Sequence, residues 1–195
     1  REIVMRSPGR FELSITGELS CPHVLESAHV LLRQNPRLSA LLPILLDSSS
    51  WEIIKILNVS LLFSVPGSQG QAWHADGAHV NVHKHEPCHC MNVFIPLADI
   101  SKEMGPTQFR PGSHILTRNL APLMLAAKAR GTLRELEAPL SNVGDVLIFD
   151  YRVLHRGLAN TSLSTRPILV ASVAKKWFKD VVNQPSRPIS SSPTL

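Results

Sequence analysis

Two residues separated by a single alanine, His74 and Asp76, have side chains that could hold a metal ion. On a β-strand, residues i and i+2 point to the same face, so the imidazole and the carboxylate can converge on one ion. One further imidazole would complete a two-histidine, one-carboxylate face, which is typical of Fe(II) sites with open positions for a cosubstrate and dioxygen. His155 is the candidate for the third ligand. The pattern therefore predicts an iron site made by His74, Asp76 and His155.

The charge of such a site predicts an anionic cosubstrate. One carboxylate offsets only part of the charge of Fe(II), so a 2-oxo acid is a favourable chelator. Arg166 follows His155 by 11 residues, which is enough chain to turn and return on an adjacent strand. A guanidinium grips a carboxylate through two parallel hydrogen bonds, and a lysine ammonium cannot do so. We therefore expect Arg166 to bind the distal carboxylate of 2-oxoglutarate.

The elements that must position these side chains are mostly short strands. A helical stretch begins at Pro22 and is broken at Asn35-Pro36, and residues 38–46 and 122–130 resemble further helices. Glycine and proline separate segments rich in branched residues, which predict strands. The expected strands are residues 10–15, 53–65, 91–97, 146–149 and 168–178. This order predicts a mainly β, barrel-like domain with flanking helices over residues 1–184, followed by a proline- and serine-rich tail at 185–195.

Composition narrows the class of protein. A chain of 195 residues with 44% hydrophobic residues can bury the core of one domain. No uninterrupted apolar run reaches the roughly 20 residues of a membrane helix. The net charge of +5 is scattered, so nucleic acid binding is not indicated. Three cysteines are too few for a disulfide framework and favour a reducing, intracellular and cytoplasmic setting. The start at Arg1, without a methionine or a signal peptide, indicates a fragment or a processed form.

Several further motifs, taken in order with this set, resemble the phytanoyl-CoA dioxygenase family between about residues 10 and 183. They are Trp73-His74-Ala75-Asp76-Gly77, Asn92-Val93-Phe94-Ile95-Pro96-Leu97, Gly105-Pro106-Thr107, Arg110-Pro111-Gly112-Ser113-His114, Phe149-Asp150-Tyr151-Arg152, His155-Arg156-Gly157 and Asn160. The resemblance implies a double-stranded β-helix (jelly-roll) core and an oxygenase dependent on Fe(II), 2-oxoglutarate and O2, with ascorbate as a supporting reductant.

The resemblance also assigns residues. It implies that His74, Asp76 and His155 bind iron, that Arg166 binds the distal carboxylate, and that Asn92 and Thr107 contact the near end of 2-oxoglutarate. Because Asp76 is present, where halogenating relatives carry a small residue, it implies hydroxylation of a C–H bond in a small molecule, with release of succinate and CO2. The family name does not identify the substrate.

Other functions stay open at the level of the sequence. A jelly-roll that binds metal or ligand without turnover is the main alternative, and a zinc hydrolase would leave Arg166 without a role. The residues at 79–90, rich in histidine and cysteine, are open to three interpretations: a second, zinc-binding site, a lid over the substrate, or a polar loop. Asp150 is either a partner that steadies a metal ligand or a strand-end carboxylate, and Arg152 is a candidate contact for an anionic substrate.

Overall fold

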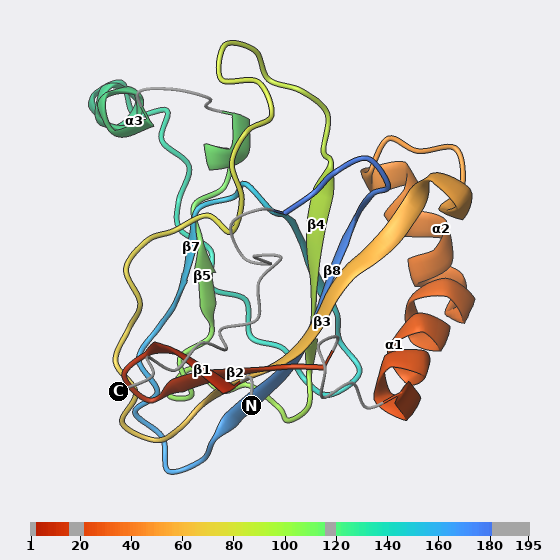
Figure 1. Ribbon diagram of the computed structural model, residues 1–195. Coiled ribbons are helices and arrows are strands. Elements are labelled where there is room, and N and C mark those ends of the chain that lie inside the picture. The colour runs from red at the N-terminus through yellow and green to blue at the C-terminus, as the bar shows by residue number, and fades with distance from the viewer. Residues whose placement is uncertain (1–2, 16–21, 116–119, 181–195) are drawn as a thin grey trace, which may run out of the picture.

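The protein, a computed structural model that describes residues 3–15, 22–115 and 120–180, is built on two antiparallel sheets. The larger has the strand order β1-β2-β3-β8-β4-β6 and the smaller pairs β5 with β7. They face each other as the two walls of a double-stranded β-helix (Figure 1), which confirms the predicted mainly β fold. The strands are β1 (Ile3–Ser7), β2 (Arg10–Ser14), β3 (Ile54–Ser64), β4 (Cys90–Pro96), β5 (Thr107–Phe109), β6 (Leu147–Asp150), β7 (His155–Gly157) and β8 (Arg166–Lys175).

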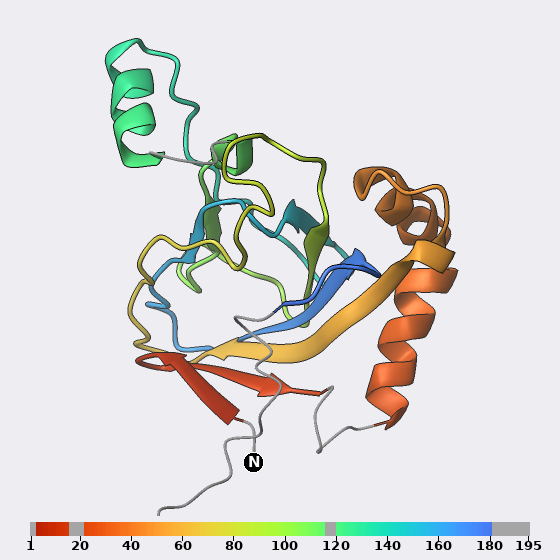
Figure 2. The same ribbon diagram turned by 45° about the horizontal axis from the view of Figure 1, so that its top comes forward.

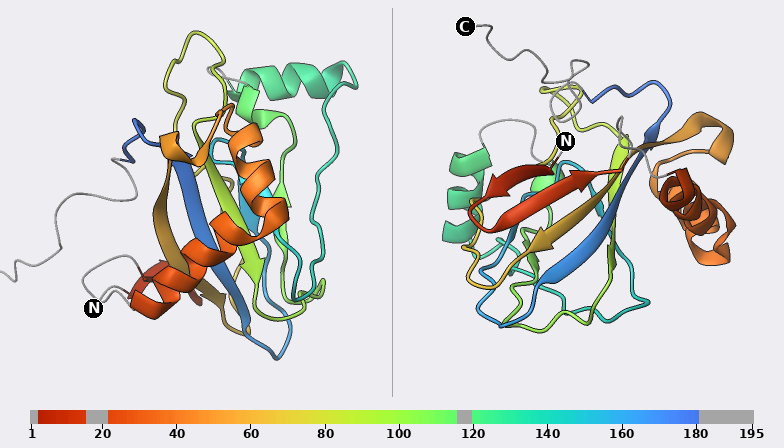
Figure 3. Two further views of the ribbon diagram at one scale, coloured as in Figure 1. Left: turned by 90° about the vertical axis from the view of Figure 1, so that its right-hand side faces the viewer. Right: turned by 60° about the horizontal axis from the view of Figure 1, so that its bottom comes forward.

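Two helices cover the outer face of the large sheet. α1 (Pro22–Gln34) lies across the strands, and α2 (Pro36–Leu45) follows it directly (Figure 3). Their buried side chains, among them Leu32 and Leu42, pack in one cluster with the outward-facing residues of β3, β4 and β8. α3 (Leu120–Ala129) and the short 3-10 helices η1 (Trp51–Ile53) and η2 (Ser113–Ile115) complete the helical part. None of the described helices has the length and apolar content needed to cross a bilayer.

The second helix begins two residues earlier than its apolar pattern predicts. The side chain of Asn35 accepts hydrogen bonds from the backbone N–H groups of Arg37 and Leu38, at 3.0 and 3.1 Å. Asn35 is therefore the N-cap, and Pro36 occupies the first turn, where its missing N–H costs nothing. The Asn-Pro pair that breaks α1 thus also starts α2.

Strand alternation divides the large sheet between the helices and the interior. On β4, Met91 and Val93 pack toward the helices, while Phe94 joins a second cluster between the two sheets that includes Phe109, Phe149 and Val153. Residues such as Asn92 and Phe94 therefore face inward. Figure 2 shows the β1–β2 hairpin extending the same sheet beyond β3. The inner face of the large sheet is consequently one wall of the space where a site can form.

An irregularity in β3 sets which of its residues face that space. The register against β8 pairs Ile56 with Val173 and Asn58 with Ser172, so two residues of β3 advance where β8 advances by one. Such a bulge reverses the facing of every later residue on the strand. As a result, Asn58 and Ser60 face inward with Ser172 and Val170, whereas Val59 joins the cluster under the helices. The predicted tail at 185–195 lies outside the described residues.

Candidate functional site

The sequence suggests a strand for the segment that carries His74 and Asp76, but in the structure this segment is not a regular strand. It is a loop whose strand-like pairing is limited to an isolated β-bridge between His74 and His155. The backbone N–H of His74 donates to the carbonyl of His155 at 3.0 Å, and that of His155 donates back at 2.8 Å. His155 itself begins β7, where it pairs with Phe109 of β5. Two parts of the chain about 80 residues apart are thereby locked together at the two histidines.

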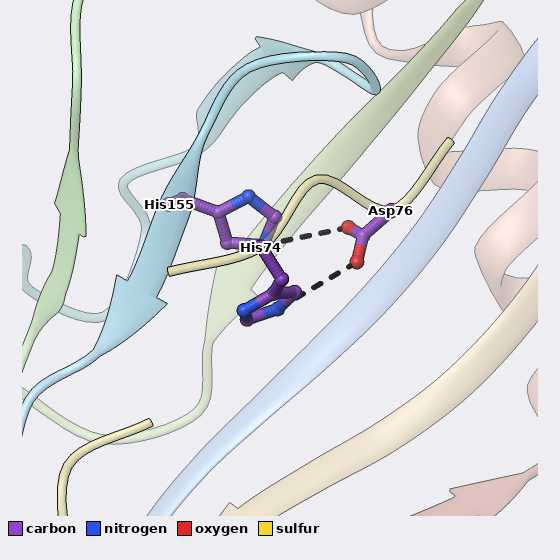
Figure 4. A group of neighbouring side chains, drawn as sticks. All are labelled: His74, Asp76 and His155. Carbon is purple, nitrogen blue, oxygen red and sulfur yellow. Dashed lines mark ion pairs between the residues drawn. The ribbon is translucent and has the colours of Figure 1, made fainter. Parts of the chain in front are cut away.

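The three predicted ligand side chains converge (Figure 4). Nε2 of His74 lies 3.8 Å from Oδ1 of Asp76, and Nε2 of His155 lies 3.5 Å from Oδ2. One ligand atom from each residue can be chosen so that all lie within 4.8 Å of one another, and no other such cluster of His, Cys, Asp or Glu occurs in the described part of the chain. Neighbouring ligands on an ion with bonds of about 2.1 Å are roughly 3 Å apart, so small side-chain shifts suffice for coordination.

Both imidazoles are held with Nε2 toward the carboxylate. Nδ1 of His74 is 2.9 Å from the carbonyl of Ala72, and Nδ1 of His155 is 3.0 Å from the carbonyl of Val153. A backbone acceptor at Nδ1 fixes the proton there and leaves the lone pair of Nε2 for a metal. Burial lowers the pKa of His155 below its usual value, which also favours the neutral ring. The arrangement is therefore suited to coordinate a divalent cation.

A hydrogen-bonded chain from the large sheet holds the carboxylate. The side-chain amide of Asn92 donates to Oδ2 of Asp76 at 2.5 Å, and the hydroxyl of Ser172 donates to Oδ1 of Asn92 at 2.7 Å. Asn92 and Ser172 are paired across β4 and β8, and both are buried. Asn92 thus reaches the site, as predicted, but its amide is directed at Asp76. Its contact with 2-oxoglutarate stays a prediction.

The Asn92→Ala variant is expected to bind Fe(II) about 10- to 100-fold more weakly, because partners that orient a ligand contribute at this level. Its affinity for 2-oxoglutarate, measured with the metal at saturation, should change less. Anaerobic titrations with Fe(II) and then with 2-oxoglutarate check both quantities. A loss of 2-oxoglutarate affinity at unchanged Fe(II) affinity would instead make Asn92 a direct cosubstrate contact.

Arg166 lies at the start of β8 with its side chain in the interior. It is 6% exposed, and one terminal nitrogen donates to the carbonyl of Gly105. Its Nε has no hydrogen-bond partner among the described residues. Burial, and then the charge of the neighbouring Arg10, lower the pKa of Arg166 to about 9, so it remains charged at neutral pH. A buried cation with an unused donor is a receptor for an anion.

One cavity of about 540 Å³ connects these groups. His74, Asp76, His155, Arg166 and the buried Thr107 all line it, so the structure brings together every residue that the sequence analysis assigned to the site, with Asn92. Sequence reasoning missed other lining residues: Asn58, Ser60, Gln71, Tyr151, Ser172 and Asp180. The signal available was the pair of polar residues at i and i+2, Asn58 and Ser60, in the middle of a mostly apolar strand.

Asp150 and Arg152 do not take the functional roles considered for them. The guanidinium of Arg152 binds both carboxylate oxygens of Asp150, at 2.9 and 2.7 Å, and donates to the carbonyl of Glu86 at 2.9 Å. Arg152 is 3% exposed and does not line the cavity. The pair therefore fastens the loop before β4 to the end of β6, and neither an anionic substrate nor a metal ligand is its partner.

The histidine-rich residues at 79–90 do not assemble a zinc site. The rings of His79, His85 and His114 lie near one another, with centroids 6.5 and 6.0 Å apart. Among the described residues, however, they do not form a group of three ligand atoms within 4.8 Å of one another. Burial raises the pKa of the Cys88 thiol, which is therefore protonated at neutral pH and is a poor ligand. The polar loop and the lid over the substrate remain as interpretations of this segment.

His89 is a separate case, because it belongs to the core. It is 2% exposed and lies tilted against the rings of Trp177 and Phe178, and neither ring nitrogen has a hydrogen-bond partner among the described residues. Burial lowers the pKa of His89 from 6.5 to about 4. Between these two pKa values, the unfolded chain binds a proton at His89 and the folded chain does not. The contribution of the neutral His89 to stability is therefore fully present above pH 6.5 and is lost as the pH falls toward 4.

We expect the His89→Phe variant to lose less stability in acid than the parent chain. The parent should lose about 2 kcal/mol of unfolding free energy between pH 7 and pH 5 through this histidine, and the variant should not. Urea denaturation at the two pH values measures the difference. The exposed His83→Phe is the control. Equal pH dependence in His89→Phe and the parent would contradict the assignment.

The chain matches a family model and resembles several solved structures. The model of the phytanoyl-CoA dioxygenase (PhyH) family matches residues 23–168. Among similar solved structures is the non-heme alpha ketoglutarate dependent epimerase SnoN from nogalamycin biosynthesis, with a TM-score of 0.64 and 18% identity over 90% of this chain and 66% of SnoN.

Two further structures share the fold. HygX from Streptomyces hygroscopicus, solved with nickel and 2-oxoglutarate, has a TM-score of 0.64 and 15% identity over 91% of this chain and 74% of HygX. EctD from S. alaskensis, solved with 2-oxoglutarate and 5-hydroxyectoine, has a TM-score of 0.63 and 18% identity over 89% of this chain and 60% of EctD. The chain thus spans a little under two thirds of SnoN and of EctD.

Proposed function

This chain belongs to the phytanoyl-CoA dioxygenase family, and from that premise we propose that it is an Fe(II)- and 2-oxoglutarate-dependent oxygenase acting on a small molecule. The observation that carries the proposal is the convergence of His74, Asp76 and His155 in one cavity with the buried guanidinium of Arg166. The metal set alone would also suit other divalent cations. A 2-oxo dicarboxylic acid also needs a cation to bind its second carboxylate, and the buried guanidinium of Arg166 can provide it.

The residues present fit the iron. The donor set of two neutral imidazoles and one carboxylate occupies one face of an ion and leaves positions open on the side of the cavity. The backbone carbonyls of Ala72 and Val153 fix both rings, and Asn92 fixes the carboxylate. The chain therefore supplies a prearranged site, whose ligands need little reorganisation when the metal binds.

The residues present also fit 2-oxoglutarate. The cosubstrate has a carboxylate at each end and two methylene groups between its distal carboxylate and its keto group. Arg166 would receive the distal carboxylate, and the hydroxyl of Thr107 lines the same cavity from the facing sheet. The inward-facing Leu62, Ile168 and Val170 provide apolar surface for the methylenes. The charge and the apolar lining thus match the two kinds of group in the cosubstrate.

When bound, the iron supplies the oxidising chemistry by which 2-oxoglutarate and dioxygen give succinate and CO2 while a substrate C–H bond is oxidised. The chain itself has three tasks in this reaction. It binds the metal on one face, orients the cosubstrate through Arg166, and shields His155 from solvent at 4% exposure, while His74 and Asp76 face the open side of the cavity. No group in these roles has to move a proton.

We favour hydroxylation as the outcome because Asp76 occupies the position of the metal carboxylate and the cavity leaves space for a substrate. Epimerisation is the second candidate, since the similar structure of SnoN is that of an epimerase. Both reactions consume 2-oxoglutarate and dioxygen. They differ in whether an atom of dioxygen enters the product, so product analysis under labelled dioxygen separates them.

An anaerobic titration tests the proposal. Adding Fe(II) and then 2-oxoglutarate should produce a weak visible charge-transfer band, and admission of air should then release succinate. The His74→Ala variant is the control that lacks one ligand. Metal binding without the band, and without succinate, would contradict the proposal and favour a jelly-roll that binds metal without turnover.

A further inference from the structure

The polarity of the inward-facing side chains of β3 and β8 changes along these strands. On β8, Arg166 is followed at alternate positions by Ile168, Val170 and Ser172, all of which line the cavity. The partners of the last three on β3 are Leu62, Ser60 and Asn58. Beyond the guanidinium, β3 and β8 therefore line the cavity with apolar side chains, and Arg6, Ser7 and Glu12 line it from β1 and β2. The opposite end is lined by hydroxyl and amide groups. We call this opposite end, formed by Asn58, Ser60, Tyr151, Ser172 and Asp180, the polar end.

The hydroxyl of Ser60 is an unsatisfied group at the polar end. Ser60 is 1% exposed, and its Oγ has no hydrogen-bond partner in the described part of the chain. Leaving a buried hydroxyl unsatisfied costs roughly 1–3 kcal/mol, and a strand interior would more favourably carry valine or threonine here. The bulge between Ile56 and Asn58 turns this serine into the cavity. The residue type and the bulge together point to a ligand that bonds to it.

A carboxylate faces the same space. Asp180, 9% exposed, accepts a hydrogen bond of 2.5 Å from the phenol of Tyr151, and both residues line the cavity. Burial and the neighbouring carboxylate raise the pKa of Tyr151, so the phenol keeps its proton and remains the donor. A ligand at the polar end would meet Asp180 best with a hydroxyl or amino group.

We propose that the polar end is the substrate subsite and that it selects a small molecule rich in hydroxyl or amino groups, with Ser60 and Asp180 as its specificity-determining contacts. This inference rests on the proposed function, since Arg166 and the metal ligands must already serve the cosubstrate and the iron. The volume of about 540 Å³ suits a metabolite together with 2-oxoglutarate.

A long acyl chain does not satisfy this surface. It would cover the Ser60 hydroxyl and the Asp180 carboxylate with methylene groups, and each covered group would then lose water without gaining a hydrogen bond. The apolar residues that could hold such a chain, Leu62, Ile168 and Val170, lie toward Arg166, where the cosubstrate is placed. The family is named for an acyl-coenzyme A thioester, but this name therefore does not indicate the substrate of this chain.

The test measures succinate formation by the iron-loaded enzyme with 2-oxoglutarate, first without substrate and then with a library in two halves. One half holds polyols, amino sugars and hydroxylated amino acids, and the other holds fatty acids, acyl-coenzyme A thioesters and terpenoid alcohols. Substrate-free succinate formation reports the proposed function alone. Compounds that raise the rate above this level should come from the first half.

Variants then locate the contact. For the best compound, Ser60→Ala should raise KM about 5- to 10-fold and Asp180→Asn by 10-fold or more, because bonds to charged groups are stronger. Both variants should raise the KM for 2-oxoglutarate less, Ser60→Thr should recover most of the loss, and the exposed Ser27→Ala should change nothing. Stimulation by the apolar half, or by no polar compound, overturns the inference although succinate still forms. Absence of succinate in every condition overturns the proposed function itself.

Discussion

Replacing Asp76 by alanine is expected to remove stable Fe(II) binding and with it all 2-oxoglutarate-dependent succinate formation. The carboxylate is the single anionic ligand of the proposed site, and it lies between Nε2 of His74 and Nε2 of His155, at 3.8 and 3.5 Å. Changes in partners beyond the ligands already cost 10- to 100-fold in metal affinity, so losing the ligand itself should cost more than about 100-fold. Anaerobic Fe(II) titration and a succinate assay measure the two effects.

The control for this variant is Asp145→Ala, which removes an exposed carboxylate from the turn before β6. It should bind Fe(II) as the parent does. Asp76→Ala also takes the acceptor from the amide of Asn92, so its thermal unfolding must be recorded without metal to show that the fold is kept. A folded Asp76→Ala that still binds Fe(II) at the affinity of the parent would refute the assignment of the triad.

The second large effect is expected at Arg166. Arg166→Lys keeps the positive charge but replaces the planar fork by a compact ammonium, which cannot make two parallel hydrogen bonds to a carboxylate. We expect the KM for 2-oxoglutarate to rise about 100-fold, since each bond to a charged group contributes roughly 1.5–3 kcal/mol. Fe(II) affinity should stay within a few-fold of the parent. The assay is succinate formation against 2-oxoglutarate concentration.

Arg156→Lys is a matched control from β7, the strand that precedes β8 in the sequence. Its guanidinium stacks over Trp73, 4.7 Å from the ring centroid, and Arg156 does not line the cavity. The same substitution there should leave the KM for 2-oxoglutarate unchanged. If Arg166→Lys behaves like Arg156→Lys, the distal carboxylate is bound elsewhere. A raised KM for the substrate in place of that for 2-oxoglutarate would assign Arg166 to the substrate subsite.

The proposed polar end relates the fold of this chain to the breadth of its family. The similar structures of SnoN, HygX and EctD share the fold at 15 to 18% identity, so little beyond the framework is common to them and this chain. In the proposed function, the metal ligands and Arg166 serve the part of the reaction that involves the cosubstrate. Asn58 and Ser60 of β3, with Asp180, line the cavity outside these roles. Substrate choice is therefore expected to lie in these side chains.

The sequence by itself determined the local features of this protein. Side-chain chemistry and spacing are properties of the chain, so His74, Asp76 and the 11-residue interval from His155 to Arg166 were sufficient to predict a metal site and an anion site. Alternation on a strand is likewise a local rule, so it puts Asn92 and Phe94 on the same face of β4, while packing decides which way that face turns. Helix α2 was predicted with an error of two residues, since the cap at Asn35 competes with the apolar pattern.

Only the tertiary structure decided how these features combine. The loop with His74 reaches its position through an isolated bridge to His155, which no strand pattern announces. Asn92 meets Asp76, and Arg152 meets Asp150, because packing brings the partners together from separate segments. The bulge in β3 turns Ser60 inward, although alternation from Ile56 would have placed it outward. A register shift depends on pairing with another strand, and pairing is a property of the folded chain.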